Sequence, residues 1–108
     1  MEIKLLYFDG CPSWQNALAS LQKIIKDEGL DFSVKLVEVK SDREAITDKF
    51  LGSPSFQVNG QDFWPDVREN YSKCCRIYNT PQGLIGWPTD GMLRQRLLEL
   101  KKEMDQSK

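Results

Sequence analysis

The chain has 108 residues, of which 15 are Lys or Arg and 16 are Asp or Glu, so its formal net charge is −1. This length is typical of one domain with a single hydrophobic core, and we expect residues 1–108 to fold as one unit. The balanced charge argues against nucleic acid or an anionic membrane as a partner, and no apolar stretch approaches the roughly 20 residues that span a bilayer. The N-terminus lacks the pattern of a secretory signal, so we expect a cytoplasmic protein.

Three cysteines and no histidine restrict the chemistry. An odd number of cysteines argues against the disulfide framework of a small secreted domain. Without histidine the chain cannot build a Ser-His-Asp triad or a Cys-His pair, and the cysteine spacing is not that of a structural zinc site. We therefore expect no resident cofactor or metal ion. A nucleophile would have to be activated by a helix dipole or by charged neighbours.

The N-terminal part of the chain predicts a strand followed by an amphipathic helix. Residues 3–8 alternate in polarity and then become continuously apolar, which is typical of a strand. From Cys11 onward, apolar side chains return with the spacing of one helical face, at Trp14, Ala17, Leu18, Leu21, Ile24 and Ile25. Gly29 follows as the expected C-terminal cap of this helix.

A second strand and a short helix are expected next. Residues 32–39 carry apolar side chains on both faces of an extended chain, so we predict a strand at a central position in a mixed sheet. Ser41 and Glu44 have the spacing of a capping box and predict the start of a short helix. Two strands thus alternate with two helices.

The second half of the chain predicts a β-hairpin and a last helix. Asn59-Gly60, between residues 55–58 and residues 61–64, is the strongest short hairpin signal because both residues tolerate positive φ. A helix with one apolar face follows near the C-terminus, capped by Thr89 or Asp90 and bearing Leu93, Leu97, Leu100 and Met104. The complete order is β-α-β-α-β-β-α, which is typical of an α/β domain with a central mixed sheet.

Residues 66–88 lack clear periodicity and form an insertion before the last helix. They contain Tyr71, Cys74, Cys75, Tyr78 and Trp87. A stretch of this length without an obvious element is usually functional or locally folded in a small domain. The insertion is therefore a second place to look for a site.

Cys11 is the best candidate for a reactive atom because it lies where the first strand passes into the first helix. Backbone N–H groups and the helix dipole at such a junction favour an anion, and hence a thiolate. Pro12 suits the first helical position, since its fixed φ and missing N–H are tolerated there. The alternative is a small buried side chain without chemistry, because free cysteine is among the most buried residue types. We expect an accessible and reactive thiol.

This order of elements, with Cys11-Pro12 at the start of the first helix and Gly52-Ser53-Pro54-Ser55 before the hairpin, resembles the thioredoxin-like superfamily over nearly the whole chain. The resemblance implies a three-layer fold in which Cys11 is the nucleophile and the peptide bond before Pro54 is cis. It also implies that Ser53 presents its backbone to a bound substrate.

Trp14 stands where the second cysteine of a Cys-x-x-Cys motif would be, so a resolving cysteine has to come from elsewhere in the chain. The sequence also resembles small thioredoxin-like proteins with a Cys-Pro-x-Trp start and a Cys-Arg-x-Tyr segment, here residues 75–78. Some of these proteins are described as relatives of alkylmercury lyase. This second resemblance implies that Cys11 pairs with Cys75, ahead of Cys74. The expected substrate contacts are Pro12, Ser53, Pro54 and Arg76.

Three functions remain open from the sequence. The first is thiol-disulfide exchange at Cys11 with a protein or small-molecule thiol or disulfide, resolved by Cys75 or Cys74. The second is binding of a soft metal ion, or binding or cleavage of an organomercurial, by the same thiols, since soft ions suit sulfur ligands. The third is a non-catalytic module that uses residues 66–88 as a protein interface.

Overall fold

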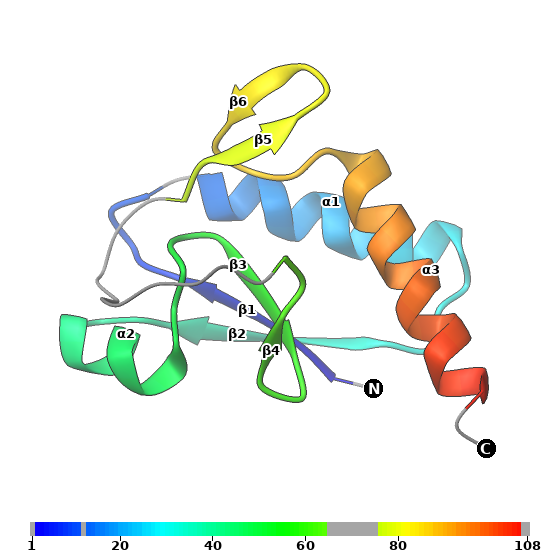
Figure 1. Cartoon of the computed structure of the whole chain (residues 1–108), viewed down its shortest axis with the longest axis horizontal. Coiled ribbons are helices and arrows are strands. Elements are labelled where there is room, and N and C mark those ends of the chain that lie inside the picture. The colour runs from blue at the N-terminus through cyan, green and yellow to red at the C-terminus, as the bar shows by residue number, and fades with distance from the viewer. Residues whose placement is uncertain (1, 12, 65–75, 107–108) are drawn as a thin grey trace.

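Figure 1 shows the computed structural model, which describes residues 2–11, 13–64 and 76–106. Its elements are β1 (Glu2–Tyr7), α1 (Ser13–Asp27), β2 (Ser33–Glu38), α2 (Asp42–Asp48), β3 (Ser55–Val58), β4 (Gln61–Asp62), β5 (Tyr78–Thr80), β6 (Gly83–Ile85) and α3 (Asp90–Gln106). The predicted order β-α-β-α-β-β-α is present, with the hairpin β5–β6 added before the last helix. The described residues therefore form a mixed α/β fold.

β1 lies inside a mixed four-stranded sheet with the order β2-β1-β3-β4. It pairs in parallel with β2, where Leu5 lies opposite Leu36, and antiparallel with β3, where Leu5 lies opposite Phe56. β3 turns into β4 through Asn59 and Gly60, and both adopt positive φ as the hairpin prediction required. Because Leu5 is wholly buried, the N-terminal strand forms part of the centre of the fold.

The prediction that residues 32–39 occupy a central position is wrong, because β2 lies at the edge of the sheet. Its only strand partner in the described residues is β1, and Leu36 is 44% exposed. Val34 packs against the core on one face and Val37 against the core on the other, and each is only partly buried. An edge strand with apolar residues on both faces has the same pattern as a central strand, so periodicity could not distinguish the two positions.

The helices of the described residues cover the two faces of the sheet (Figure 1). α1 and α3 pack on one face, in a main core that consists of Ile3, Leu5, Ala17, Leu21, Ile24, Leu30, Phe32, Phe56, Val58, Phe63, Leu93, Leu97 and Leu100. α2 covers the other face with a smaller cluster of Leu6, Val39, Ala45 and Phe50. None of the helices in the described part of the chain is long and apolar enough to cross a membrane.

The helix boundaries follow local signals in the sequence. Gly29 adopts a φ of +62° after α1, so the predicted glycine cap is confirmed. Ser41 caps α2, since its Oγ accepts a hydrogen bond from the backbone N–H of Glu44 at 3.1 Å. Of the two caps considered for α3, Thr89 is the one present, because its Oγ1 accepts from the backbone N–H of Met92 at 3.2 Å.

The region between β4 and α3 folds in part as a hairpin. β5 and β6 pair antiparallel, with Tyr78 opposite Ile85, and form a separate two-stranded sheet near the N-terminal end of α1 (Figure 1). The returning strand predicted at residues 61–64 stops at Asp62, because the backbone N–H of Trp64 turns back to Asp62 Oδ1 at 2.8 Å. Residues 66–75 of the predicted insertion lie outside the described residues.

Candidate functional site

Cys11 lies in the connection between β1 and α1, two positions before the first residue of the helix. Its backbone N–H donates to the carbonyl oxygen of Phe8 at 3.2 Å, which turns the chain from the strand towards the helix. Its Sγ lies 3.6 Å from the carbonyl oxygen of Ser53, in the loop before β3. The predicted strand-to-helix junction is therefore present, and a loop that is distant in the sequence meets the thiol there.

The thiol is nearly closed to solvent. Cys11 is only 4% exposed, so the accessible thiol expected from the sequence is not observed. Because a carbonyl oxygen only accepts hydrogen bonds, the contact with Ser53 uses the protonated thiol as the donor. Reaction at Sγ therefore requires a movement that uncovers the sulfur.

The peptide bond between Ser53 and Pro54 is cis, as predicted. Both residues are fully buried, and Ser53 is the one whose carbonyl oxygen contacts Cys11. The Oγ of Ser53 is buried, and no hydrogen-bond partner for it occurs in the part of the chain that the structure describes. A buried hydroxyl left unsatisfied costs about 1–3 kcal/mol, and an incoming polar ligand could satisfy it.

The three carbonyl groups of residues 52–54 all accept hydrogen bonds from within the chain. Their donors are, in order, Ser55 Oγ, the backbone N–H of Arg76 and Tyr78 Oη. The bonds from Arg76 and Tyr78 measure 2.9 and 2.6 Å. The loop is therefore tied to the segment that enters β5.

The side chain of Arg76 is buried in a cluster of polar groups. Its guanidinium pairs with Asp62 at 2.9 Å, and the two side chains are only 8% and 6% exposed. It also donates to the carbonyl oxygen of Trp64 at 2.8 Å and lies 4.6 Å from the ring centroid of Tyr78. The guanidinium is thus engaged within the chain, which leaves little of it for the substrate contact that the sequence predicted.

Tyr78 completes the same cluster. Burial raises the pKa of Tyr78 above its ordinary value, and the opposing effect of the neighbouring Arg76 charge is smaller. The phenol therefore stays protonated at neutral pH and can donate its hydrogen bond to Pro54. Together with the bond from Arg76, this contact ties β5 to the loop before β3.

Gly52 permits the close approach of Arg76, and sequence reasoning missed it as a site residue. Its φ is +116°, a conformation that residues with a side chain rarely adopt. A Cβ at this position would lie 2.7 Å from the Cβ of Arg76 and 2.9 Å from its Cα. The position of Gly52 just before Ser53-Pro54 marks it as part of the loop. That position does not show that Arg76, 24 residues later, packs against it. Asp62 was missed as well, because its partner Arg76 also lies far along the chain.

Two further contacts surround the N-terminal end of α1. A Cβ at Gly86, just after β6, would lie 2.7 Å from Oγ of Ser13, the first residue of α1. Trp14, at the position where a dithiol motif would have its second cysteine, stacks on Tyr7 with ring centroids 4.2 Å apart. Gly86 and Tyr7 therefore lie against the beginning of α1, where Ser13 and Trp14 are half-buried.

Three predicted site residues, Pro12, Cys74 and Cys75, lie outside the described residues, so their roles stay predictions. Within residues 2–11, 13–64 and 76–106, no group of three or more His, Cys, Asp or Glu residues is placed so that it could hold a metal ion. The described site thus consists of the Cys11 thiol, the loop at residues 52–54 and the segment anchored by Arg76.

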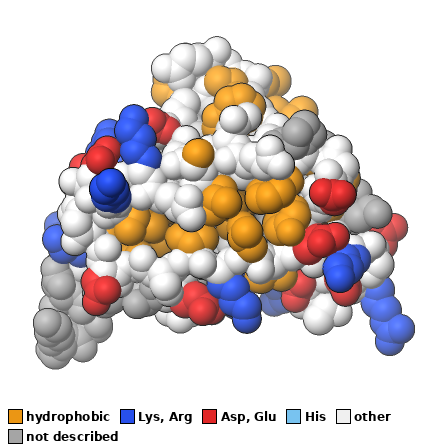
Figure 2. Space-filling view, turned by 180° about the vertical axis from the view of Figure 1, so that it is seen from behind, with side chains coloured by type: hydrophobic (Ala, Val, Ile, Leu, Met, Phe, Trp, Pro, Cys, Tyr) orange, Lys and Arg blue, Asp and Glu red, His pale blue; other side chains and the backbone are white. Residues whose placement is uncertain are grey.

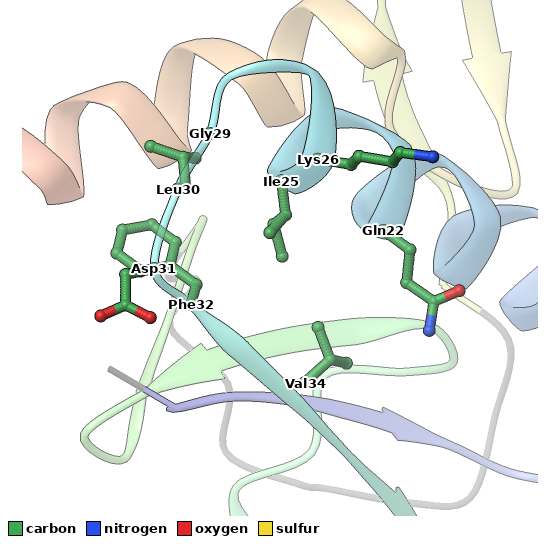
Figure 3. Close-up of a pocket in the computed structure, with 8 residues that line it drawn as sticks. All are labelled: Gln22, Ile25, Lys26, Gly29, Leu30, Asp31, Phe32 and Val34. Carbon is green, nitrogen blue, oxygen red and sulfur yellow. The ribbon is translucent and has the colours of Figure 1, made fainter.

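A groove lies at the opposite end of α1, between this helix and the edge strand β2 (Figure 3). Its volume is about 590 Å³, and it is lined by Gln22, Ile25, Lys26, Gly29, Leu30, Asp31, Phe32 and Val34. Figure 2 shows apolar side chains gathered across the middle of one face of the molecule. The first lining residue, Gln22, follows the first residue of α1 by nine positions, so about 14 Å of helix separates the groove from the end of α1 near the thiol.

Replacing Gly52 by Ala should destabilise the fold more than the same change at Gly60. At Gly60, where φ is +79°, a Cβ would meet no atom within 4 Å, so Gly60→Ala should cost only about 1–2 kcal/mol for the backbone conformation. Gly52→Ala adds overlap with Arg76, and such overpacking costs about 1–3 kcal/mol more. Urea unfolding of both variants measures the difference, and equal losses would contradict the close approach.

Asp62→Asn should lower the free energy of unfolding by about 3 kcal/mol, because Arg76 would keep a buried charge without its partner. The matched control is Glu28→Gln, which removes the carboxylate from a pair with Arg94 whose side chains are 32% and 41% exposed. This control should cost less than about 1 kcal/mol. Urea unfolding of both variants is the measurement. A loss for Asp62→Asn as small as that of the control would show that the buried pair does not hold the loop.

Tyr78→Phe tests the hydrogen bond to Pro54 and its pH dependence. At neutral pH the variant should lose about 1 kcal/mol of unfolding free energy. Because the folded pKa of Tyr78 is raised, the native state keeps a proton that the unfolded state loses from about pH 10 upward. Wild-type stability should fall faster than that of the variant in this range, so their difference should shrink. Urea unfolding at neutral and alkaline pH measures it, and a constant difference would contradict the assignment.

Comparisons with models of known protein families, with curated proteins and with solved structures found no match. The chemistry of the site must therefore be inferred from its contacts. These contacts bring together the Cys11 thiol, the unsatisfied Ser53 hydroxyl and the segment anchored by Arg76.

Proposed function

We propose that the chain is a thioredoxin-like thiol-disulfide oxidoreductase in which Cys11 is the nucleophile and Cys75 is the resolving cysteine. The mixed sheet, with α1 and α3 on one face and α2 on the other, is compatible with the three layers of such a fold. The position of Cys11 between the first strand and the first helix, against the loop before β3, supports its role.

One observation carries the proposal. The carbonyl oxygen of Ser53 contacts both Cys11 Sγ, at 3.6 Å, and the backbone nitrogen of Arg76, at 2.9 Å. The sulfur and this nitrogen can therefore be no farther apart than the sum of these two distances. Cys75 is the residue covalently joined to that nitrogen. The bound applies to a sulfur and a backbone nitrogen, and it supports the pairing because it places the chain neighbour of Cys75 beside the thiol.

The exchange proceeds in two displacements. Cys11 gives its proton to solvent, and its thiolate attacks one sulfur of a substrate disulfide. A mixed disulfide forms, and the other substrate sulfur leaves as a thiolate. The thiolate of Cys75 then attacks the Cys11 sulfur, forms the Cys11–Cys75 disulfide and releases the second substrate thiolate. The substrate gains two electrons and the dithiol of the chain loses them, and an external thiol in a reducing compartment such as the cytoplasm restores the dithiol.

Ionisation of Cys11 and exposure of its sulfur are linked in this proposal. The thiol is held as a donor to Ser53, so loss of the proton removes that hydrogen bond and frees the sulfur to move. α1 begins two residues after Cys11, so the thiol lies before the N-terminal end of a helix, the end at which anions are generally bound. The contact with Ser53 is thus made by the protonated thiol, whereas the displacement is made by the thiolate.

The proposal predicts a Cys11–Cys75 disulfide when the reduced full chain is mixed with oxidised 2-mercaptoethanol. Cys75→Ser should stop the reaction at a mixed disulfide on Cys11, because the second displacement has lost its nucleophile. Cys74→Ser is the matched control and should behave as the wild type. Alkylation of the remaining thiols followed by peptide mapping by mass spectrometry identifies each product.

Two outcomes would count against this proposal. If Cys11 stays reduced in the folded wild type and in both serine variants, thiol exchange is not its function, and a non-catalytic module becomes the better account. If the mixed disulfide accumulates equally in Cys74→Ser and Cys75→Ser, Cys75 has no special part in resolving it.

A further inference from the structure

The stability of a disulfide within one chain depends on how closely the fold holds its two thiols. In the dithiol form, each thiol meets the other at an effective concentration that the fold sets, and this concentration rises when both backbones are fixed near each other. A higher effective concentration makes the disulfide harder to reduce, so its reduction potential becomes more negative. A contact that fixes the backbone next to Cys75 beside Cys11 can therefore set this potential.

Arg76 is the first described residue after Cys75, and one backbone hydrogen bond places it beside the thiol. Its N–H donates to the carbonyl oxygen of Ser53 at 2.9 Å, and the same oxygen lies 3.6 Å from Cys11 Sγ. A single backbone hydrogen bond contributes little net stability, because both of its groups can bond to water instead. The segment therefore needs further support to stay beside the thiol.

The side chain of Arg76 supplies that support. Its guanidinium pairs with Asp62 at 2.9 Å, where the two side chains are almost closed to solvent, and it donates to the carbonyl oxygen of Trp64 at 2.8 Å. Asp62 belongs to β4 and lies opposite Gln57 of β3, so this anchor is part of the four-stranded sheet. Arg76 is thus tied to the sheet by its side chain and to the loop at Ser53 by its backbone.

The charge of Asp62 decides whether this anchor holds. A buried guanidinium that loses its carboxylate partner is strongly destabilised, and it regains stability by moving to water. The backbone of Arg76 would move with its side chain and weaken the bond to Ser53. A carboxylate on β4 thereby acts on the thiols through Arg76.

Resting on the proposed function, we infer that Asp62 is a positioning residue: its ion pair with Arg76 holds the backbone next to Cys75 beside Cys11 and makes the Cys11–Cys75 disulfide harder to reduce. When this disulfide forms, the two thiols lose two electrons and two protons, and one sulfur-sulfur bond forms. An external disulfide takes up these electrons and protons and becomes two thiols. Asp62 takes no part in the transfer and affects only its equilibrium.

The test measures the equilibrium of the Cys11–Cys75 disulfide with reduced and oxidised glutathione at neutral pH. The full chain carries Cys74→Ser, so that only the two proposed thiols take part. Samples equilibrated at a series of glutathione ratios are quenched with acid and alkylated, and mass spectrometry measures the dithiol and disulfide forms. Asp62→Asn is the test variant, because the amide removes the charge but keeps an oxygen that can accept from the backbone N–H of Trp64.

We expect Asp62→Asn to lower the equilibrium constant of disulfide formation at least about threefold, which makes the reduction potential less negative by about 14 mV. The control is Leu100→Ala, which removes a buried side chain of α3 from the main core and lies outside the Arg76 cluster. Such a truncation is strongly destabilising because it leaves a cavity. The control should keep the wild-type equilibrium constant, since a general loss of stability does not move the two thiols apart.

A decrease of less than about threefold in Asp62→Asn would overturn the inference and leave the proposed function intact. An equal decrease in Leu100→Ala would also overturn it. If Asp62→Asn does not fold, the milder Tyr78→Phe removes another tie between β5 and the loop and should lower the constant at least about twofold, and an unchanged constant would overturn the inference. Absence of the disulfide from the wild-type pair at every glutathione ratio would overturn the proposed function, and the inference with it.

Discussion

The carbonyl oxygen of Ser53 is the acceptor on which the arrangement of the site depends. It receives the Cys11 thiol and the backbone N–H of Arg76, and so joins the end of β1, the loop before β3 and the start of β5. The bond to Arg76 is possible because Gly52 leaves room for it and because Asp62 compensates the buried guanidinium. A charge taken out of water needs such a partner, so the ion pair with Asp62 helps to hold the segment, together with the bonds to Ser53, Trp64 and Pro54.

A thiol held in this way is shielded from solvent. Cys11 is 4% exposed, and its thiol donates to the carbonyl oxygen of Ser53 two residues before α1 begins. Under the proposed function, the contacts that close the site would also restrict what can enter it, since discrimination can come from excluding a competitor as well as from binding a partner. Under the proposed function, protection and selectivity therefore share one structural cause.

Sequence patterns succeeded where few neighbouring residues decide the structure. The glycine cap at Gly29 and the turn at Asn59-Gly60 were predicted from local patterns and are present. The cis bond before Pro54, which only the resemblance implied, is present as well. The edge position of β2 was not predicted, because a strand that is half covered on both faces has the same pattern as a central one. The hairpin β5–β6 was missed because strands of three residues are too short to show a period.

The sequence by itself determined the type and order of most elements and the location of one cysteine at a strand-to-helix junction. Only the tertiary structure decided that this cysteine is buried against Ser53, that Arg76 pairs with Asp62, and that Gly52 is the point of closest approach. The physical reason is that caps and turns depend on adjacent residues, whereas desolvation and close packing depend on which distant segments meet.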